Sequence, residues 1–462
     1  MNVLALDIYL GPLRAGLLFQ YGAGSTALTR FVPDEAFWAD PASPVFSWAA
    51  TDDDAQRREI FWRSHVSTPF FNAEGGRLPA FFQNLLPEGP LRRHLEQLRG
   101  CGPNDHFDML AACGTDLPGN VYAYPAQLDA DALSGVVTQH HDALEMSVTA
   151  DPLPDATSLS GVQPKLALVQ QPGRYVARTK DAQGTHIIAK LPTVEFALLP
   201  EVEELSLRLA QAAGVQVCEA WLAPLDDIVA GQPFVLGQSR NFLAVKRFDR
   251  APQGHIHCED FAQILRIQPE EKYTHPAATY AAMARTLREG MSLPAAEAEA
   301  AAEELIRRVM VNEMLGNYDA HVKNFGVVYP DGHTPALSPA YDVVAYAAYL
   351  GGRGHALRFV PGGEKQARLN AATVRSFCNA AGMFETRVRS VLREAVGKAC
   401  QTWPALIAAS GLLDKQKQNL LHHFEACHAV QSWRARRAGA GRKAATAVAA
   451  PSVPSAKPPT AA

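Results

Sequence analysis

Apolar and polar positions change their period along the chain and divide it into regions. Residues 1–70 alternate short apolar runs with clusters of Gly, Pro and Asp, which predicts a small β-rich module. Residues 79–120 turn to a helical pattern. Residues 131–157 become polar and contain Pro, which predicts a linker that is clearest at residues 151–155. We therefore expect an N-terminal subdomain and its linker over residues 1–150.

The next region predicts a first lobe over residues 151–248. Apolar, strand-like segments occupy residues 166–169, 185–190 and 241–249. A helical apolar face over residues 201–214 lies between them. The last strand becomes polar at its end, as a segment joining two lobes does.

A second, mainly helical lobe is predicted over residues 249–435. Residues 297–316 place apolar side chains three and four positions apart and end at a glycine, which is typical of a buried helix. A strand at residues 325–329 and a turn at residues 330–332 follow. The chain then returns as a hairpin partner from residue 336.

Composition and charge limit the classes of protein that fit. The 462 residues include 47% hydrophobic residues, enough for two or three packed domains. The formal charge of −4 argues against a general nucleic-acid binder. After residue 436 the chain is Ala, Pro, Ser, Lys and Arg without periodicity, so residues 436–462 are expected to form a disordered tail.

Cysteine usage and the first residues favour the cytoplasm. The seven cysteines are scattered and form no Cys-x-x-Cys pair, which indicates reduced thiols. Asp7 interrupts the first apolar run before it reaches the length of a signal-peptide core. No apolar stretch is long enough to span a bilayer, so no membrane partner is expected.

The most informative spacing lies at residues 317–324, Asn-Tyr-Asp-Ala-His-Val-Lys-Asn, which we call the catalytic loop. Asp319 is followed five positions later by Asn324, and the next Asp in an apolar, strand-like context is Asp342. A kinase places a catalytic base and two magnesium ligands in this order, because phosphoryl transfer mainly needs positioned reactants and neutralised charge. The loop therefore predicts the base and the metal ligands of a phosphotransferase.

Two further side chains of the catalytic loop, His321 and Lys323, are expected to face the phosphates of a nucleotide. A simpler interpretation of the loop by itself stays open, because an Asp- and Asn-containing segment after a helix often only caps it and forms a turn. The predicted hairpin would bring Asp342 back beside Asn324, which favours the catalytic interpretation.

A candidate phosphate site precedes the catalytic loop. Residues 158–165, Ser-Leu-Ser-Gly-Val-Gln-Pro-Lys, which we call the phosphate loop, can form an anion-binding nest of amides near Gly161. Lys190 follows an apolar strand, as the phosphate-binding lysine of kinases does, and Glu203 on the next helix is its predicted ion-pair partner. A turn with one glycine and a lysine at a strand end are each common for other reasons.

Taken in order, these segments resemble the HipA family of serine/threonine kinase toxins. The shared motifs lie at residues 81–89, 107–114, 158–165, 185–190, 245–250, 259–261, 272–273, 317–325 and 341–342. The similarity runs from near residue 1 to about residue 430. It implies an α+β, two-lobed protein-kinase-like fold after a small β-rich N-terminal subdomain.

The resemblance also implies roles for residues. Asp319 and His321 would be catalytic, Asn324 and Asp342 would hold Mg²⁺, and Ser158 and Ser160 would be candidates for autophosphorylation. A phosphate on that loop is expected to expel it from an ATP site by charge repulsion. The implied ATP-binding residues are Ser160, Gly161, Val162, Gln163, Pro164, Lys165, Lys190, Lys246, Arg247, Phe248, His321, Tyr341, Asp342, Val343 and Val344.

As a family member the chain is expected to be an ATP- and Mg²⁺-dependent serine/threonine protein kinase and the toxin of a toxin–antitoxin pair. The expected partners are a small HipB-like helix-turn-helix antitoxin and a protein substrate, for which an aminoacyl-tRNA synthetase is the family precedent. DNA would be reached only indirectly, through the antitoxin.

Three positions depart from the family pattern. Lys190 stands one residue later than in the Thr-His-Ile-Ile-Lys version, and Pro164 and Lys246 replace acidic residues. These changes leave open a nucleotide-gated partner or co-repressor of the antitoxin with vestigial phosphotransfer. A small-molecule phosphotransferase would use the same site. The intact Asp319, Asn324 and Asp342 favour an active phosphotransferase over the vestigial partner, and only a substrate screen separates the protein kinase from the small-molecule enzyme.

Overall fold

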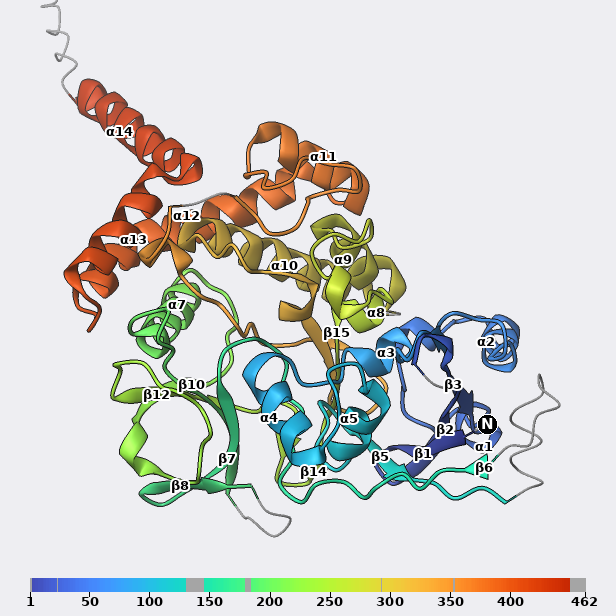
Figure 1. Ribbon diagram of the computed structural model, residues 1–462. Coiled ribbons are helices and arrows are strands. Elements are labelled where there is room, and N and C mark those ends of the chain that lie inside the picture. Colours follow the sequence, from blue (N-terminus) through green and yellow to red (C-terminus); the bar gives the residue numbers. More distant parts are fainter. Residues whose placement is uncertain are drawn as a thin grey trace, which may run out of the picture.

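The computed structural model describes residues 2–22, 24–129, 145–178, 184–291, 293–351 and 354–448. Figure 1 shows three parts in chain order: a β-rich N-terminal subdomain, a first lobe built on a second sheet, and a helical second lobe. The predicted α+β architecture with two lobes and a β-rich N-terminal subdomain is confirmed.

The N-terminal subdomain is built on a sheet with the strand order β4-β3-β2-β1-β5, with β6 paired to the start of β1. Its strands are β1 (Asn2–Leu10), β2 (Leu13–Tyr21), β3 (Leu28–Pro33), β4 (Asn72–Glu74), β5 (Val121–Pro125) and β6 (Glu145–Met146). Its helices are α1 (Glu35–Trp38), α2 (Ala55–Arg63), α3 (Ala80–Gln83), α4 (Gly89–Arg99) and α5 (His106–Ala112). Leu6 and Ile8 of β1 enter the core shared with these helices, whereas Val3 and Ala5 face a smaller core, as the two-residue period of a strand requires.

The first lobe contains a sheet with the order β10-β12-β9-β7-β8-β11. Its elements are β7 (Lys165–Gln171), β8 (Arg174–Ala177), β9 (Thr185–Lys190), α7 (Leu199–Ala212), β10 (Ala220–Pro224), β11 (Ile228–Val229) and β12 (Asn241–Lys246). Helix α7 buries Val202, Leu205 and Leu209 in the same core as Leu243 of β12. The antiparallel register places Lys165 directly opposite Lys190, so two lysines share one face at one end of the sheet.

The second lobe consists mainly of helices, together with one two-stranded and one three-stranded sheet. Its strands are β13 (Arg250–Ala251), β14 (Gly254–His255), β15 (His257–Asp260), β16 (Gly326–Tyr329) and β17 (Ala336–Leu337). Its α-helices are α8 (Phe261–Ile264), α9 (Tyr280–Arg285), α10 (Ala295–Leu315), α11 (Ala371–Ala381), α12 (Glu385–Ala408), α13 (Asp414–Ala426) and α14 (His428–Val448). Strands β16 and β17 form the predicted hairpin, with Val327 opposite Leu337.

Helix α14 differs from the disordered tail expected from residue 436. It continues to Val448, and Figure 1 shows its later turns projecting away from the lobe, while residues 449–462 lie outside the described part. The expectation rested on the absence of an apolar period, but alanine is the best helix former, and a helix that needs no packing partner shows no such period. No helix in the described part of the chain is long and apolar enough to cross a membrane.

The predicted linker is partly fixed to the N-terminal subdomain. Residues 130–144 lie outside the described residues, but residues 145–157 follow the subdomain's surface. Arg99 of α4 donates to the carbonyl oxygens of Ala150 and Asp151 at 2.7 and 2.6 Å, and the amide of Leu153 donates to Ala112 O at 3.0 Å. The chain therefore enters the first lobe along a fixed path.

Buried hydrogen bonds attach the N-terminal subdomain to the second lobe. The carboxylate of Glu259, on β15, accepts from Ser47 Oγ at 2.7 Å and from the Trp48 amide at 2.8 Å. Trp48 Nε1 donates to Gly290 O at 2.9 Å. These contacts join residues more than 200 positions apart and fix the subdomain beside the lobes.

Candidate active site

A cavity of about 170 Å³ lies where the N-terminal subdomain and both lobes meet. Its walls come from the phosphate loop, the lysines at the ends of β7 and β9, the segment after β12, and the catalytic loop with Asp342. These segments lie up to 184 positions apart in the sequence, from Ser158 to Asp342, and the fold brings them to one cavity.

The catalytic loop is set by the end of a long helix. Helix α10 ends at Gly316, whose φ of 61° lies in the left-handed region that favours glycine. The amide of Asn317 then donates to Asn312 O at 2.8 Å, which turns the chain inward. Short helix η6 (Val322–Asn324) follows, and Asn324 Oδ1 accepts from the His321 amide at 3.1 Å. The helix cap and the candidate base thus lie on one loop. The capping interpretation and the catalytic interpretation of the sequence therefore both apply to it.

The two predicted metal ligands lie side by side. Asn324 Nδ2 donates to Asp342 Oδ2 at 3.1 Å, and Tyr341 Oη donates to Lys323 O at 2.9 Å, which ties the returning hairpin to the catalytic loop. Asp342 itself has a φ of 55°, an uncommon conformation for a residue with a side chain. The hairpin holds this backbone so that the carboxylate faces the cavity.

Lys190 stands at the centre of the charged groups. Its ammonium contacts the carboxylates of Glu203 and Asp342, so the predicted partner from α7 is present together with the candidate metal ligand. Burial lowers the pKa of Lys190, but the two carboxylates outweigh it, raise this pKa above the ordinary value and keep the lysine charged. The sequence left open whether Lys190 stands at the position of the phosphate-binding lysine. In the fold, this lysine does reach the cavity.

Asp342 is ionised for a related reason. Burial raises its pKa, but the charges of Lys190 and Lys165 outweigh burial and hold this pKa well below the usual carboxyl range. Lys165 also donates to Ser160 O, and burial lowers the pKa of its ammonium. One carboxylate and two lysines thus form a compact charged floor for the cavity.

The phosphate loop is only partly at the cavity. Ser158, Ser160, Gly161 and Lys165 line it, whereas Val162, Gln163 and Pro164 do not, although they were predicted to bind the nucleotide. Gln163 Nε2 donates to Leu191 O at 3.0 Å, and Pro164 O accepts from the Leu191 amide at 2.9 Å, so these two residues fix the loop to the end of β9.

The two candidate serines have different surroundings. Ser158 is 0% exposed, its hydroxyl donates to Leu85 O, and its amide donates to Asp116 O at 3.0 Å. Ser160 is half-buried, and its Oγ lies 3.3 Å from Glu88 Oε1. Ser158 is therefore accessible only after the segment that carries it moves away from the N-terminal subdomain.

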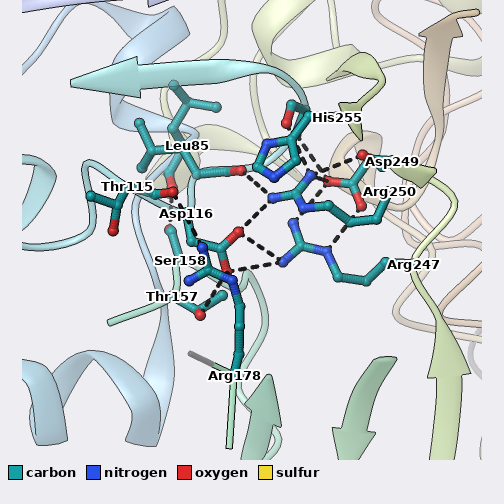
Figure 2. Close-up of polar contacts among 12 residues, drawn as sticks. Leu85, Thr115, Asp116, Thr157, Ser158, Arg178, Arg247, Asp249, Arg250 and His255 are labelled. Carbon is teal, nitrogen blue, oxygen red and sulfur yellow. Dashed lines mark hydrogen bonds and ion pairs between the residues drawn. The ribbon is translucent and has the colours of Figure 1, made fainter. Parts of the chain in front are cut away.

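An ionic cluster, defined by Asp116, Arg178, Arg247, Asp249 and Arg250, lies behind the phosphate loop. Figure 2 shows Asp116 facing all three guanidinium groups, with Asp249 beside Arg247 and Arg250. The shortest contacts join Arg250 Nη2 to Asp116 Oδ1 and Arg250 Nη1 to Asp249 Oδ2, each at 2.7 Å. The cluster joins the N-terminal subdomain to the strand β8 and to the segment after β12.

The same cluster anchors the start of the phosphate loop. Thr157 Oγ1 donates to Asp116 Oδ2 at 2.7 Å, next to the Ser158 amide that bonds Asp116 O. Burial raises the pKa of Asp116, but Arg247 and Arg250 outweigh it and bring this pKa well below the ordinary range. Arg247, which was predicted to bind the nucleotide, lines the cavity, while its guanidinium is engaged in this cluster.

The other residues that were predicted to bind the nucleotide follow β12 or Asp342, and only some of them line the cavity. Lys246 and Phe248 line the cavity, but the Lys246 ammonium contacts Glu219 Oε2 at 2.7 Å on the exposed side. Phe248 packs on Tyr341 with ring centroids 5.6 Å apart. Val343 and Val344 do not line the cavity and belong to the core of the second lobe.

Lys323 lines the cavity, but its ammonium is engaged mainly by the N-terminal subdomain. Its ammonium contacts Asn84 O and Oδ1 at 3.0 Å each, Asp260 Oδ2 at 3.3 Å and Glu88 Oε1 at 3.5 Å. Glu88 also accepts from Lys272 at 3.1 Å. The N-terminal subdomain thus supplies part of one wall of the cavity through Asn84, and Glu88 lies behind it against Lys323 of the catalytic loop.

Glu88 and His321 complete the electrostatics of this wall. Burial raises the pKa of Glu88, but Lys323 and Lys272 outweigh it and lower this pKa to about 2. Burial lowers the pKa of His321 to about 3, so its ring is neutral at ordinary pH. His321 Nδ1 is buried without a hydrogen-bond partner in the described residues, which leaves it available to a ligand in the cavity.

Sequence reasoning missed Asn84, Glu88 and Asp116 as parts of the site. The segments at residues 81–89 and 107–114 were recognised as family motifs, but no role was assigned to them. Only their order along the chain was visible, and contacts such as Asn84 with Lys323 join positions 239 apart.

Comparisons with known proteins agree with this geometry. Residues 6–124 match the family model of the HipA N-terminal domain, and residues 157–403 match that of the HipA-like C-terminal domain. A Sinorhizobium fredii protein named "Putative kinase Y4dM" is 36% identical over 334 residues, which cover 71% of this chain and 77% of that protein.

The chain is also similar to proteins from Shewanella oneidensis. The serine/threonine-protein kinase toxin HipA of that organism is 25% identical over 370 residues, 75% of this chain and 76% of the toxin. A solved complex of HipA, HipB and operator DNA from the same species contains a chain with a TM-score of 0.61 and 20% identity, covering 91% of this chain and 96% of that one. This likeness shows that the fold is shared over nearly the whole length.

Proposed function

This chain belongs to the HipA-like family, whose relatives include named kinases, and from that premise we propose that it is an ATP- and Mg²⁺-dependent serine/threonine protein kinase. The observation that carries the proposal is the convergence of Lys190, Glu203, Asn324 and Asp342 in one cavity. A buried strand lysine paired to a helix glutamate, beside an Asn–Asp pair, is the arrangement that phosphotransfer uses.

Asp319 is the proposed general base. Its carboxylate lies on the catalytic loop, and burial raises its pKa above the ordinary value. A raised pKa suits a group that takes the proton of an acceptor hydroxyl. Lys190 and Lys165 hold the phosphates of ATP at the floor of the cavity, and the neutral His321 donates or accepts a hydrogen bond there without adding charge.

The residues present fit a magnesium ion. Asp342 offers an ionised carboxylate, and Asn324 offers an amide oxygen beside it, the oxygen donors that a hard cation prefers. When bound there, Mg²⁺ neutralises phosphate charge. Asn324 must exchange its bond from Nδ2 to Asp342 for a contact through its oxygen.

We propose autophosphorylation at Ser158 or Ser160, which rests on the position of both on the phosphate loop. Ser160 reaches the cavity as the structure stands, whereas Ser158 requires the loop to leave Leu85 and Asp116 first. A phosphate on either serine adds about two negative charges beside the ionised Glu88 and Asp342. Such a loop is not expected to return to its present place.

We also propose that the protein is the toxin of a toxin–antitoxin pair with a small HipB-like DNA-binding partner. The proposal is supported by the shared fold with a chain of the HipA–HipB–DNA complex over 91% of this chain. A pull-down with the product of a neighbouring helix-turn-helix gene tests it, and absence of any complex with that product contradicts it.

The kinase proposal is tested with [γ-³²P]ATP and Mg²⁺. Asp319→Asn is expected to lower phosphate incorporation by roughly 10²–10⁴-fold, the usual contribution of a general base. Asp226→Asn, a change of the same kind at an exposed aspartate, serves as the matched control and is expected to label like the wild type. An Asp319→Asn protein that labels as well as this control refutes the assigned base, and mass spectrometry of wild type locates the labelled serine.

A further inference from the structure

The candidate base is already held by a tyrosine. Tyr273, shortly after the short helix η4 (Pro269–Glu271), donates its hydroxyl hydrogen bond to Asp319 Oδ1. The two residues are 46 positions apart, so the contact is made by the fold and not by local chain geometry. Asp319 Oδ2 accepts no hydrogen bond within the described part of the chain.

The Tyr273 ring is fixed from two sides. Its centroid lies 5.0 Å from that of His321 at an interplanar angle of 71°, an edge-to-face contact with the catalytic loop. The Lys272 ammonium lies 5.7 Å from the same ring centroid and contacts Glu88 Oε2 at 3.1 Å. Tyr273 is still 38% exposed, so its contact with Asp319 is not closed off from an incoming acceptor.

We infer that Tyr273 is a positioning residue of the phosphotransfer, which fixes Oδ1 of Asp319 so that Oδ2 remains free for the hydroxyl of the incoming acceptor. The inference rests on the proposed kinase function and adds a residue to it. A carboxylate without this bond rotates about its Cβ–Cγ axis and spends part of its time with neither oxygen toward the acceptor.

The surroundings of Asp319 support this role. Burial raises the pKa of Asp319, and the charges of Asp342 and Glu88 raise this pKa further. The hydrogen bond from the Tyr273 hydroxyl and the charge of Lys272 lower it. His321 and Tyr346 are the other titratable groups that lie near. Tyr273 is the neighbour that acts through a direct hydrogen bond, so its removal affects both the orientation and the proton affinity of the base.

The test compares Tyr273→Phe, which keeps the ring and removes the hydroxyl, with Tyr122→Phe. Tyr122 lies on β5, outside the cavity lining, and its hydroxyl is 2.9 Å from His255 Nδ1, so this change controls for loss of a tyrosine hydroxyl away from the site. Initial rates of ³²P transfer to the protein and to added casein are measured at varied ATP, at pH values from 5 to 9, together with the melting temperature.

Tyr273→Phe is expected to lower kcat about tenfold, with the KM for ATP within about twofold of wild type, and to move the acidic limb of the rate profile upward by about one pH unit. Tyr122→Phe is expected to match wild type in kcat, in KM for ATP and in the position of the acidic limb. A Tyr273→Phe protein with the wild-type rate and profile, or with a faster rate, overturns the positioning role while the kinase function stands. A wild-type protein that transfers no phosphate overturns both proposals, so the two failures are distinguishable.

Discussion

Asp116→Asn is the change that most directly tests the ionic cluster. It removes one of two carboxylates that face three guanidinium groups, so the formal charge of the cluster rises from +1 to +2 while the shape of the side chain is kept. Asp116 is 0% exposed, and water does not screen the loss. The remaining charges of Arg247 and Arg250 stay buried with one partner fewer.

Breaking a buried ion pair by removing one partner costs roughly 3–5 kcal/mol in free energy of unfolding. The asparagine oxygen still accepts from Thr157, so we expect a value near the lower end, about 3 kcal/mol. With a urea m-value near 3 kcal/mol/M, the urea midpoint moves down by about 1 M. Asp226→Asn is expected to stay within about 0.5 kcal/mol of wild type.

The assay is urea unfolding followed by tryptophan fluorescence, with hydrogen exchange as the local measurement. Thr157 Oγ1 and the Ser158 amide both donate hydrogen bonds to Asp116. We therefore expect faster amide hydrogen exchange at residues 157–160 in Asp116→Asn. Since the Asp116 pKa is lowered by folding, its stabilising contribution is present above the ordinary carboxyl pKa and is lost as the pH falls through the folded value. A variant with the wild-type midpoint and wild-type exchange at residues 157–160 refutes the reasoning.

Three further predictions follow from single contacts. Burial raises the pKa of Glu259 to about 7, so the folded protein binds one more proton than the unfolded chain between about pH 4.5 and pH 7. The contribution of this group to the free energy of unfolding therefore falls as the pH rises through that range. The urea midpoint of wild type minus that of Glu259→Gln should therefore decline from pH 5 to pH 8, and a flat difference contradicts the assignment. Gly290→Ala places a Cβ 2.2 Å from Trp48 Cζ2 and should lower the free energy of unfolding in urea by about 1–3 kcal/mol. Gly231→Ala, whose Cβ has no atom within 4 Å, should lower it less, and equal urea midpoints for the two variants contradict the close contact. Lys190→Met leaves two carboxylates without their cation and should lower ³²P transfer by roughly 10²-fold or more, and a protein that keeps a tenth of the activity would argue against the assigned lysine.

The sequence predicted the local elements of the site well. The helix expected at residues 297–316 is α10 (Ala295–Leu315), and the expected hairpin is β16 with β17. Lys190 and Glu203 meet as predicted, because a strand end followed by one helix leaves few ways to pack the two. Periodicity and turn residues decide such short-range features.

Contacts between distant segments could not be predicted in the same way. The helical motif at residues 81–89 gives no sign that Asn84 and Glu88 will bind Lys323, since a polar residue between apolar ones is usually on the surface. Arg247 was assigned to the nucleotide from its motif, but its guanidinium reaches Asp116, 131 positions earlier. Burial of charge depends on partners that only the assembled fold supplies.

The contacts of Asn84 and Glu88 with Lys323 have a consequence for recombination between relatives. The two family models leave residues 125–156 between them, which looks like a natural place to join the front of one homologue to the back of another. Such a chimera would pair one parent's Asn84 and Glu88 with the other parent's Lys323, and one parent's Asp116 with the other's Arg247 and Arg250. Exchange at that junction should succeed only between parents that share these pairs, so the two halves are expected to be inherited together.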